Sequence, residues 1–188
     1  MNGVDQSLFL WLNLGPGAPA WLLEAARAIS LQWPHWMVAA TLAVALTGRP
    51  PWRAQAARVL FSLALAAIAA AGLKHGFHLP RPFMLGLGTA WLPHGATAGF
   101  PSSHTAAAAA FAASAALAPL RWPVRGLLLA SALAMAWSRV ALGLHFPSDI
   151  LAGLCLGVLC AALVQWAGPA LARYSAGRGR RPEAELLS

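Results

Sequence analysis

Long apolar stretches separated by short polar ones constrain this chain more than any other feature. Residues 53–73, 123–141 and 147–168 are each close to the roughly 20-residue length of a helix that crosses a bilayer, and they carry few charges. Only helices and closed barrels satisfy every backbone group in lipid. With 59% hydrophobic and 10% charged residues, the composition also excludes an ordinary soluble domain. The sequence therefore predicts an all-α fold, a polytopic transmembrane bundle of five to six helices.

The remaining segments extend this bundle. Residues 5–14 hold aromatic side chains but are too short to span, so we expect an N-terminal interfacial helix. Residues 18–48 are interrupted by Pro34 and predict either one bent span or two shorter helices. Residues 75–100 are rich in Gly, Pro and His and predict a long loop, which is followed by a helix over residues 102–118.

The basic residues indicate how the chain is oriented. The formal charge is +8, but the arginines form short clusters between apolar segments and no stripe interleaved with exposed aromatics, which argues against nucleic acid as a partner. Under the positive-inside rule the clusters mark cytoplasmic connections, and alternation places residues 75–100 and 139–149 on the opposite, extracytoplasmic side. The clusters comprise Arg49, Arg53 and Arg58; Arg121 and Arg125; and Arg173, Arg178, Arg180 and Arg181.

The length of the chain fits one domain. Residues 1–170 are expected to form a single integral-membrane domain, and residues 171–188 a basic cytoplasmic tail that is disordered. The oligomeric state is left open at this point.

Four charged residues outside the arginine clusters lie at or near a predicted membrane boundary: Lys74, Arg81, Arg139 and Asp149. Each has an ordinary explanation on its own, since Lys74 and Arg81 can reach lipid headgroups, and Arg139 can pair with Asp149. Three separate segments, however, bring them to the same boundary together with two histidines. Because an ionisable group in a membrane usually has a partner or a function, the set predicts a functional site.

The stretch PSSHT at residues 101–105 opens an alanine-rich helix. A serine in this position commonly caps a helix by accepting a hydrogen bond from a free backbone N–H. The same N–H groups and the helix dipole also favour a bound phosphate. The pentapeptide alone leaves both interpretations open for Ser102.

Together these side chains suit phosphoryl transfer without a metal or other cofactor. The three cations can neutralise the oxygens of a pentavalent phosphorus. His145 can act as a covalent nucleophile, Asp149 can hold its imidazole in one tautomer, and His104 can protonate the leaving oxygen. A metal site is the competing interpretation of two histidines and an aspartate, but the three cations would repel a divalent ion.

Three motifs occur in a fixed order along the chain. Residues 74–82, KHGFHLPRP, have the form K-x6-R-P; residues 101–104, PSSH, are similar to P-S-G-H; and residues 138–149, SRVALGLHFPSD, have the form S-R-x5-H-x3-D. In these motifs the chain resembles the type 2 phosphatidic acid phosphatase superfamily, which also includes soluble vanadium haloperoxidases. The resemblance covers roughly residues 53–168.

The resemblance implies a role for each matching residue. His145 would attack phosphorus, Asp149 would orient it, and His104 would act as the general acid. Ser103 stands where the family usually has glycine, which bears on how closely the backbone approaches the phosphate there. The phosphate would be held, without a metal, by Lys74, Arg81, Ser102, the backbone of Ser103, and Arg139.

Within the superfamily, the segments LFLWLN and LPHGATAGFPSSHT are most similar to bacterial undecaprenyl pyrophosphate phosphatases of the bacitracin-resistance type. The resemblance implies an inner-membrane enzyme of cell-wall biogenesis, with its active site facing the periplasm or cell exterior, that forms a phosphohistidine. Its partners would be a lipid phosphate or diphosphate substrate and membrane lipids. The open alternatives are a phosphatidylglycerol phosphate or phosphatidic acid phosphatase, a non-enzymatic lipid-phosphate binder or transporter, and a vanadate-dependent oxidation enzyme.

Overall fold

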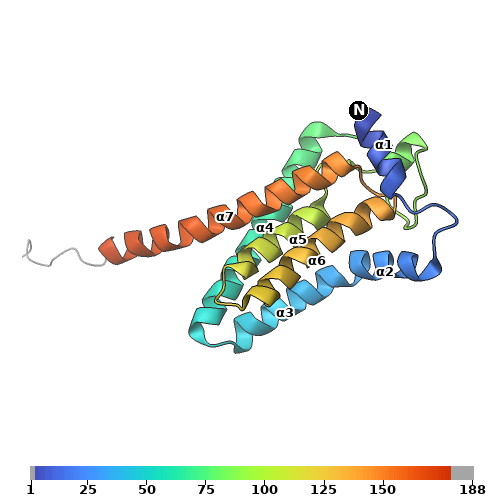
Figure 1. The fold of residues 1–188 in the computed structure, drawn as a ribbon. Coiled ribbons are helices and arrows are strands. Elements are labelled where there is room, and N and C mark those ends of the chain that lie inside the picture. The colour runs from blue at the N-terminus through green and yellow to red at the C-terminus, as the bar shows by residue number, and fades with distance from the viewer. Residues whose placement is uncertain (1–2, 179–188) are drawn as a thin grey trace, which may run out of the picture.

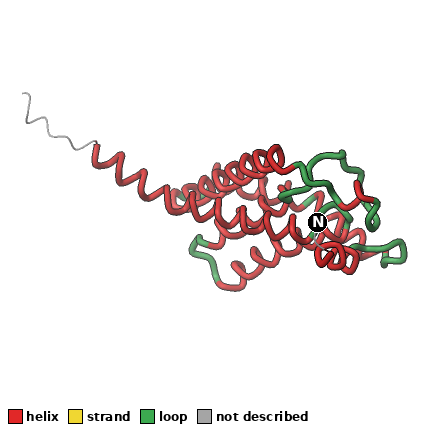
Figure 2. The backbone as a smooth tube through the Cα atoms, turned by 90° about the horizontal axis from the view of Figure 1, so that it is seen from above, coloured by secondary structure: helices red, strands yellow, loops and turns green. Residues whose placement is uncertain are grey.

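The computed structural model describes the backbone of residues 3–178 and the side chains of residues 3–167. Within this part of the chain every regular element is helical, as predicted (Figure 1), and Figure 2 shows loops only at the ends of the helices. The elements are α1 (Gly3–Leu12), α2 (Ala20–Leu31), α3 (Trp33–Thr47), α4 (Pro50–Phe77), the short 3₁₀ helix η1 (Pro82–Leu85), α5 (Ser103–Ala116), α6 (Trp122–Ala141) and α7 (Pro147–Arg178).

The expected count of five to six helices in the bundle is not confirmed. The described residues hold seven α-helices, of which α4, α6 and α7 are long and apolar enough to cross a membrane. The pair α2 and α3 gives a fourth candidate span, bent by 40°. Helix α5 has only 14 residues, and its length of about 21 Å is shorter than the ~30 Å hydrocarbon core of a bilayer.

The stretch 18–48 forms two helices, α2 and α3, which meet at a bend and together count as one candidate span. Helix α2 ends where the N–H of Gln32 donates to the carbonyl of Ala28 at 2.9 Å. Helix α3 begins at the next residue, with Pro34 in its first turn. Proline has no N–H, and its ring clashes with the preceding turn of a helix, so one helix cannot continue unchanged through this point.

Helix α5 lies at the centre of the bundle and packs against α4, α6 and α7 (Figure 1). Its side chains are mostly alanine, and small residues allow helices to approach closely. On the facing side of α7, a Cβ at Gly157 would lie 2.7 Å from the Cβ of Ala109, and a Cβ at Gly153 would lie 3.2 Å from that of Thr105. This close packing fixes the beginning of α5 against the beginning of α7.

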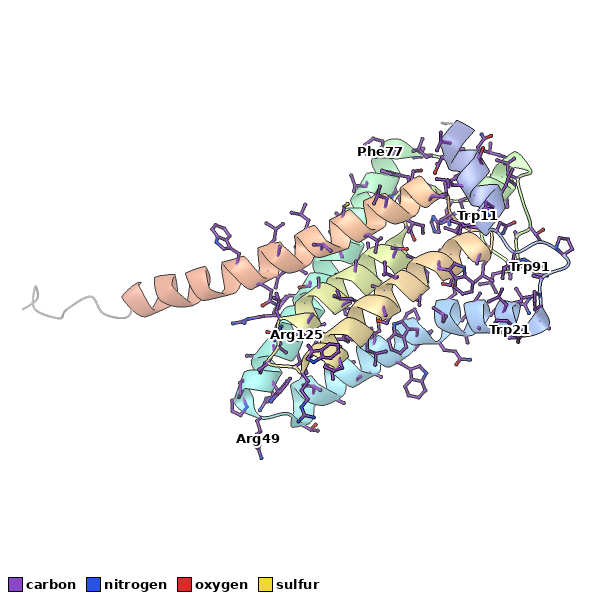
Figure 3. The ribbon with its side chains drawn as sticks, viewed as in Figure 1. Trp11, Trp21, Arg49, Phe77, Trp91 and Arg125 are labelled. Carbon is purple, nitrogen blue, oxygen red and sulfur yellow. The ribbon has the colours of Figure 1, made fainter. Side chains whose placement is uncertain are left out.

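The segments predicted to form a site lie at one end of the bundle, called here the tryptophan end after Trp11 and Trp91 (Figure 3), although Trp52 and Trp122 lie at the other end. Figure 3 places Arg49 and Arg125 at one end and Trp11 and Trp91 at the other. The loop over residues 78–102, the turn between α6 and α7, and helix α1 gather at the tryptophan end (Figure 1). The segments predicted to form a site therefore meet at the end away from Arg49 and Arg125.

Helix α1 packs against the tryptophan end. Phe9 is buried, and its ring meets that of Phe146 edge to face with the centroids 5.4 Å apart. Asp5 accepts hydrogen bonds from the N–H and the hydroxyl of Ser148, at 2.9 and 2.6 Å. The predicted N-terminal helix is therefore present, and its position at a membrane interface stays a prediction.

Two helices extend beyond the ends predicted from the sequence. Helix α4 continues to Phe77, past the expected start of the loop at residue 75, and η1 forms inside that loop. Helix α7 continues to Arg178, into the stretch 171–188 that is predicted to be a disordered tail. Residues 179–188, including the predicted cytoplasmic Arg180 and Arg181, lie outside the described residues, so the tail stays a prediction.

Candidate active site

A pocket of ≈ 220 Å³ opens among the predicted site residues. Five of them line it: Lys74, Arg81, Ser103, His104 and His145. Two residues that the sequence did not single out, His94 and Thr97, line it as well. The three remaining predicted residues do not line the pocket and are buried: Ser102, Arg139 and Asp149.

The two cations of the first motif hold the loop that precedes α5. Lys74 lies in the last turn of α4, and its Nζ donates to the carbonyls of Ala98 and Gly99, at 3.0 and 3.3 Å. Arg81 lies in extended backbone before η1, and its Nε donates to the carbonyl of Thr97 at 3.0 Å. Both cations therefore donate hydrogen bonds to backbone carbonyls in the structure. An incoming anion would compete with these carbonyls for the same donors.

His145 has a different partner on each ring nitrogen. Its Nε2 lies 3.0 Å from Nη1 of Arg81, and its Nδ1 lies 3.4 Å from Oδ2 of Asp149. A guanidinium only donates, so Nε2 must accept and carry the lone pair, which leaves the proton on Nδ1 facing the carboxylate. His145 thus has the tautomer that a nucleophile attacking from the pocket side needs.

The turn between α6 and α7 sets this geometry. Gly143 has φ +77°, a conformation that glycine adopts without strain, and a Cβ there would also meet the backbone of Thr89. Asp149 lies in the first turn of α7, where its Oδ2 accepts the N–H of Phe146 at 3.0 Å. The same oxygen, Oδ2, therefore accepts a backbone hydrogen bond and faces Nδ1 of His145.

Ser102 caps helix α5. Its Oγ accepts the N–H of Thr105 at 3.4 Å and lies 2.9 Å from the hydroxyl of the same residue. The side chain is fully buried, and the backbone N–H of Ser102 donates to the carbonyl of Asp149 at 3.1 Å. Of the two interpretations of this serine, the structure shows the cap, and a contact between Ser102 and a phosphate stays a prediction.

The next two residues present the beginning of α5 to the pocket. Ser103 is partly exposed, and His104 is exposed with no hydrogen-bond partner in the described part of the chain. Because the first N–H groups of a helix have no partner within it, an anion in this pocket would lie near free donors. His104 is free to reach a ligand.

Arg139 is buried near the pocket but is turned into the bundle. Only 2% of its surface is exposed, and its Nη1 donates to the hydroxyl of Ser30 on α2. Its Nε has no partner among the described residues. The sequence allows an ion pair between Arg139 and Asp149. Among the described residues this pair does not form, and Asp149 pairs with His145 instead.

Asn13 joins three segments beside the site. Its Nδ2 donates to the carbonyls of Thr89 and Ala141, both at 3.0 Å, and its Oδ1 accepts the N–H of Thr89 at 2.7 Å. The end of α1 is thereby tied to the loop that carries His94 and to the end of α6. No motif marks Ser30. Asn13 ends the segment LFLWLN, and His94 and Thr97 lie in LPHGATAGFPSSHT, but the resemblance of these segments gave none of the three residues a role.

The electrostatic surroundings keep His145 neutral. Burial holds its pKa well below the ordinary 6.5, and the positive charges of Arg81, Arg139 and Lys74 act in the same direction. A neutral imidazole is the form that can attack phosphorus, once its Nε2 lone pair is released from Arg81. The geometry therefore places a neutral imidazole, a carboxylate beside its Nδ1 and cations around one pocket, and the catalytic roles of these groups stay predictions.

Comparison with known proteins identifies this arrangement. Residues 55–172 match the PAP2 superfamily. The chain belongs to the PAP2 superfamily. This confirms the family that the three motifs predict, and the match contains every site residue predicted from the sequence.

Two relatives resemble this PAP2 protein in sequence. It is 30% identical over 162 residues to the Escherichia coli K12 protein named "Putative undecaprenyl-diphosphatase YbjG", and the match covers 85% of this chain and 80% of that one. It is 41% identical over 64 residues to the lipid A 1-phosphatase of Rhizobium etli, and this match covers 34% of this chain and 27% of that one.

Two crystal structures share the fold. LpxE of Aquifex aeolicus superimposes with a TM-score of 0.73 at 20% identity, over 87% of this chain and 96% of that one. The PAP2-type phosphatidylglycerolphosphate phosphatase of Bacillus subtilis superimposes with a TM-score of 0.71 at 23% identity, over 89% and 85%. At these identities the likeness shows that the PAP2 bundle is shared.

Proposed function

We propose that this PAP2 protein is an integral-membrane phosphatase that hydrolyses undecaprenyl pyrophosphate to undecaprenyl phosphate and inorganic phosphate. The observation that carries the proposal is the position of His145, which has Asp149 on its Nδ1 side and Arg81 and the pocket on its Nε2 side. A nucleophile, its orienting carboxylate and nearby cations are what phosphoryl transfer through a covalent intermediate requires.

In the first step, Nε2 of His145 forms a bond to the terminal phosphorus while the bond from that phosphorus to the bridging oxygen breaks. The electron pair of the broken bond goes to the bridging oxygen, which takes a proton from His104 and departs as undecaprenyl phosphate. Burial and the charge of Arg139 lower the pKa of His104 to about 4, so the bound anion must raise it for His104 to hold this proton. Asp149 stabilises the positive charge that forms on the imidazole.

In the second step, water attacks the phosphohistidine. His104 takes a proton from this water, the phosphorus–nitrogen bond breaks, and its electron pair returns to Nε2 of His145. Inorganic phosphate leaves, and both histidines regain their starting protonation states.

The remaining site residues bind the transferring phosphoryl group. Lys74 and Arg81 exchange carbonyl partners for phosphate oxygens, and the backbone N–H of Ser103 at the start of α5 donates to the same group. The buried Nε of Arg139, which has no partner among the described residues, supplies a further donor when the side chain turns toward the anion. Fixed donors of this kind lower the barrier by stabilising charge in the transition state.

A prenyl diphosphate in the outer leaflet of the bacterial inner membrane is the substrate that best fits these features. The Escherichia coli relative bears an undecaprenyl-diphosphatase name and aligns over most of both chains. Arg49 and Arg125 lie at the end of the bundle opposite Trp11 and Trp91 (Figure 3). The positive-inside rule assigns such arginines to the cytoplasm, which supports a site that opens outward.

The test is a substrate panel on the purified protein. Phosphate release is measured from undecaprenyl pyrophosphate, phosphatidylglycerol phosphate and phosphatidic acid, with the His145→Ala variant as the blank. We expect the highest kcat/KM on the prenyl diphosphate. A higher kcat/KM on phosphatidylglycerol phosphate or phosphatidic acid would make that lipid the substrate. Lipid binding without turnover would show that the protein is a lipid-phosphate binder and not an enzyme.

A further inference from the structure

His94 stands between two cavities. It lines the ≈ 220 Å³ pocket that contains His145, and it also lines a neighbouring hollow of ≈ 350 Å³. The other walls of this hollow are mostly apolar: Phe83, Ala90, Trp91, Leu92 and Pro93. A substrate that extends from the phosphate pocket into the hollow therefore passes His94.

The ring of His94 is held in a way that leaves one nitrogen free. Its Nδ1 lies 3.2 Å from the carbonyl of Gly95. A carbonyl only accepts, so Nδ1 carries the proton and Nε2 keeps its lone pair. The ring also lies against Phe83, with the centroids 6.5 Å apart and the planes tilted by 39°. Neither contact uses Nε2, which is available to a ligand.

The charge of His94 depends on what fills the pocket. Burial lowers its pKa from the ordinary value, the hydrogen bond to Gly95 raises it, and repulsion from Arg81, Arg139 and Lys74 lowers it again. An anion that neutralises these cations removes the repulsion. His94 can then take up a proton and donate from Nε2.

A single phosphoryl group already has its partners without His94. Lys74, Arg81 and the beginning of α5 supply positive charge and N–H donors, and His145 and His104 supply the chemistry. Thr97 is a second unassigned residue in the same wall, with its hydroxyl 3.5 Å from Nη2 of Arg81. The pocket thus holds two more polar groups than one phosphate needs.

We propose that His94 and the hydroxyl of Thr97 form a second phosphate subsite, which binds the phosphate nearer the lipid in a diphosphate substrate. This inference rests on the proposed function, in which the terminal phosphate lies at His145. The second phosphate follows after one bridging oxygen and reaches His94. The apolar hollow beyond it accommodates the beginning of the hydrocarbon chain. The subsite makes the enzyme prefer diphosphates over monoesters, since a monoester has no phosphate to place there.

The test compares two probes that differ only by one phosphate, farnesyl diphosphate and farnesyl monophosphate, on the purified full-length protein. We expect His94→Ala to lower kcat/KM on the diphosphate roughly 10- to 100-fold, the effect of losing one hydrogen bond to a charged group. The value on the monophosphate stays near that of the wild type. His94→Gln, whose amide can still donate, recovers part of the loss.

The matched control is His35→Ala. His35 is also exposed and also contacts a backbone carbonyl through Nδ1, that of Leu31 at 2.7 Å, but it does not line the pocket. We expect it to leave kcat/KM on both probes unchanged.

A second measurement needs no turnover. Methylene diphosphonate, which cannot be cleaved by this reaction, should inhibit the wild type more strongly than inorganic phosphate, and His94→Ala should remove the difference. A structural role for His94 would instead lower the rates on both farnesyl probes equally and keep the inhibitor preference, and that outcome overturns the subsite.

The two proposals fail in different ways. Wild-type protein that turns over no prenyl diphosphate contradicts the proposed function. Wild-type protein that hydrolyses farnesyl diphosphate, while His94→Ala does so equally well, contradicts the second phosphate subsite alone.

Discussion

The guanidinium of Arg81 lies 3.0 Å from Nε2 of His145 and, through the same nitrogen, 3.0 Å from the carbonyl of Leu144. One side chain therefore holds both the reacting nitrogen and the backbone beside it. Because Arg81 only donates, it keeps the lone pair of His145 directed toward the pocket until a phosphate takes its place. His145 and Arg81, the proposed nucleophile and a proposed phosphate-binding cation, are thus positioned together.

His145 should remain neutral well into the acidic range. Its surroundings are Arg81, Arg139, Lys74, His104 and the carboxylate of Asp149, and burial together with the positive charges lowers its pKa from 6.5. A lowered pKa means that the charged form appears only when the pH falls below the ordinary value. In a titration of ¹³C-labelled histidine by NMR, the signal that is lost in His145→Gln should have its midpoint below pH 6.5. A midpoint at or above pH 6.5 would contradict this account of the site.

Asp149→Asn should lower kcat with little change in KM. The amide can turn its NH₂ group toward Nδ1 of His145, which would place the proton of the imidazole on the reacting Nε2. The wrong tautomer of a catalytic histidine costs on the order of 10⁴-fold in kcat. KM changes little because Asp149 does not line the pocket.

The control for this substitution is Glu24→Gln. Glu24 is an exposed carboxylate that pairs with Arg27 at 2.8 Å on α2, and exposed pairs contribute little to stability. Wild-type kinetics are expected for it. An Asp149→Asn enzyme that keeps its kcat would show that the carboxylate does not orient His145.

The motifs predicted which residues meet, because helix ends on one side of a membrane lie together. Lys74 lies in the last turn of α4, His104 in the first turn of α5, and His145 between α6 and α7. These positions along the chain were enough to predict that the three residues lie at the same end of the bundle. The direction of a side chain depends on packing that the sequence does not show. Ser102 turns into the helix as its cap, and Arg139 reaches Ser30 on α2.

The loop before α5 was predicted from the sequence, but the direction of its side chains was not. His94 and Thr97 lie in irregular backbone, where no period of 3.6 residues indicates which way a side chain faces. Their positions are set by tertiary contacts, such as the hydrogen bonds from Arg81 to the carbonyls of Thr97 and Ala98. The bend at Gln32 has a local cause, because Pro34 in the first turn of α3 prevents one helix from continuing unchanged.

The orientation of the site can be tested by labelling single cysteines. Gly15 is exposed, a Cβ there meets no heavy atom within 4 Å, and the neighbouring Leu14 accepts a hydrogen bond from Trp91 at the tryptophan end. In a variant without Cys155 and Cys160, Gly15→Cys should react with an impermeant thiol reagent on intact spheroplasts. Gly88 is unsuitable for this purpose, because it has φ +64° and a Cβ there would lie 2.7 Å from Phe9.

The matched cysteine for the other end is Gly126→Cys. Gly126 follows Arg125, is exposed, and also has no heavy atom within 4 Å of a Cβ. It should react only after lysis. The reverse pattern, with Gly15→Cys protected in intact cells, would move the substrate to the cytoplasmic leaflet.

Activity should not depend on a divalent metal ion. Lys74 and Arg81 already bring positive charge to the pocket, with the N–H groups at the start of α5 beside them. Enzyme treated with EDTA should keep most of its rate, and vanadate, which imitates pentavalent phosphorus, should inhibit it. Loss of activity with EDTA that is restored only by a metal ion would contradict the mechanism.

His104 should matter more for some substrates than for others. It is exposed, lines the pocket and has no hydrogen-bond partner among the described residues, so it is free to act on the leaving group. When a diphosphate is cleaved, the departing group is a phosphate monoester with a second pKa of about 6, which can leave as an anion with little help. A phosphatidic acid must expel an alkoxide, which depends on a proton from the enzyme.

We therefore expect His104→Ala to lower kcat/KM on phosphatidic acid by about 10²- to 10⁴-fold, the usual range for a general acid, and on undecaprenyl pyrophosphate by much less. His145→Ala should abolish both activities, because the nucleophile is needed whatever the leaving group. The measurement is the ratio of wild-type to variant kcat/KM on each lipid, which reports the loss of transition-state stabilisation. Equal losses on the two lipids would mean that His104 serves to bind phosphate, since only proton donation depends on the basicity of the departing oxygen.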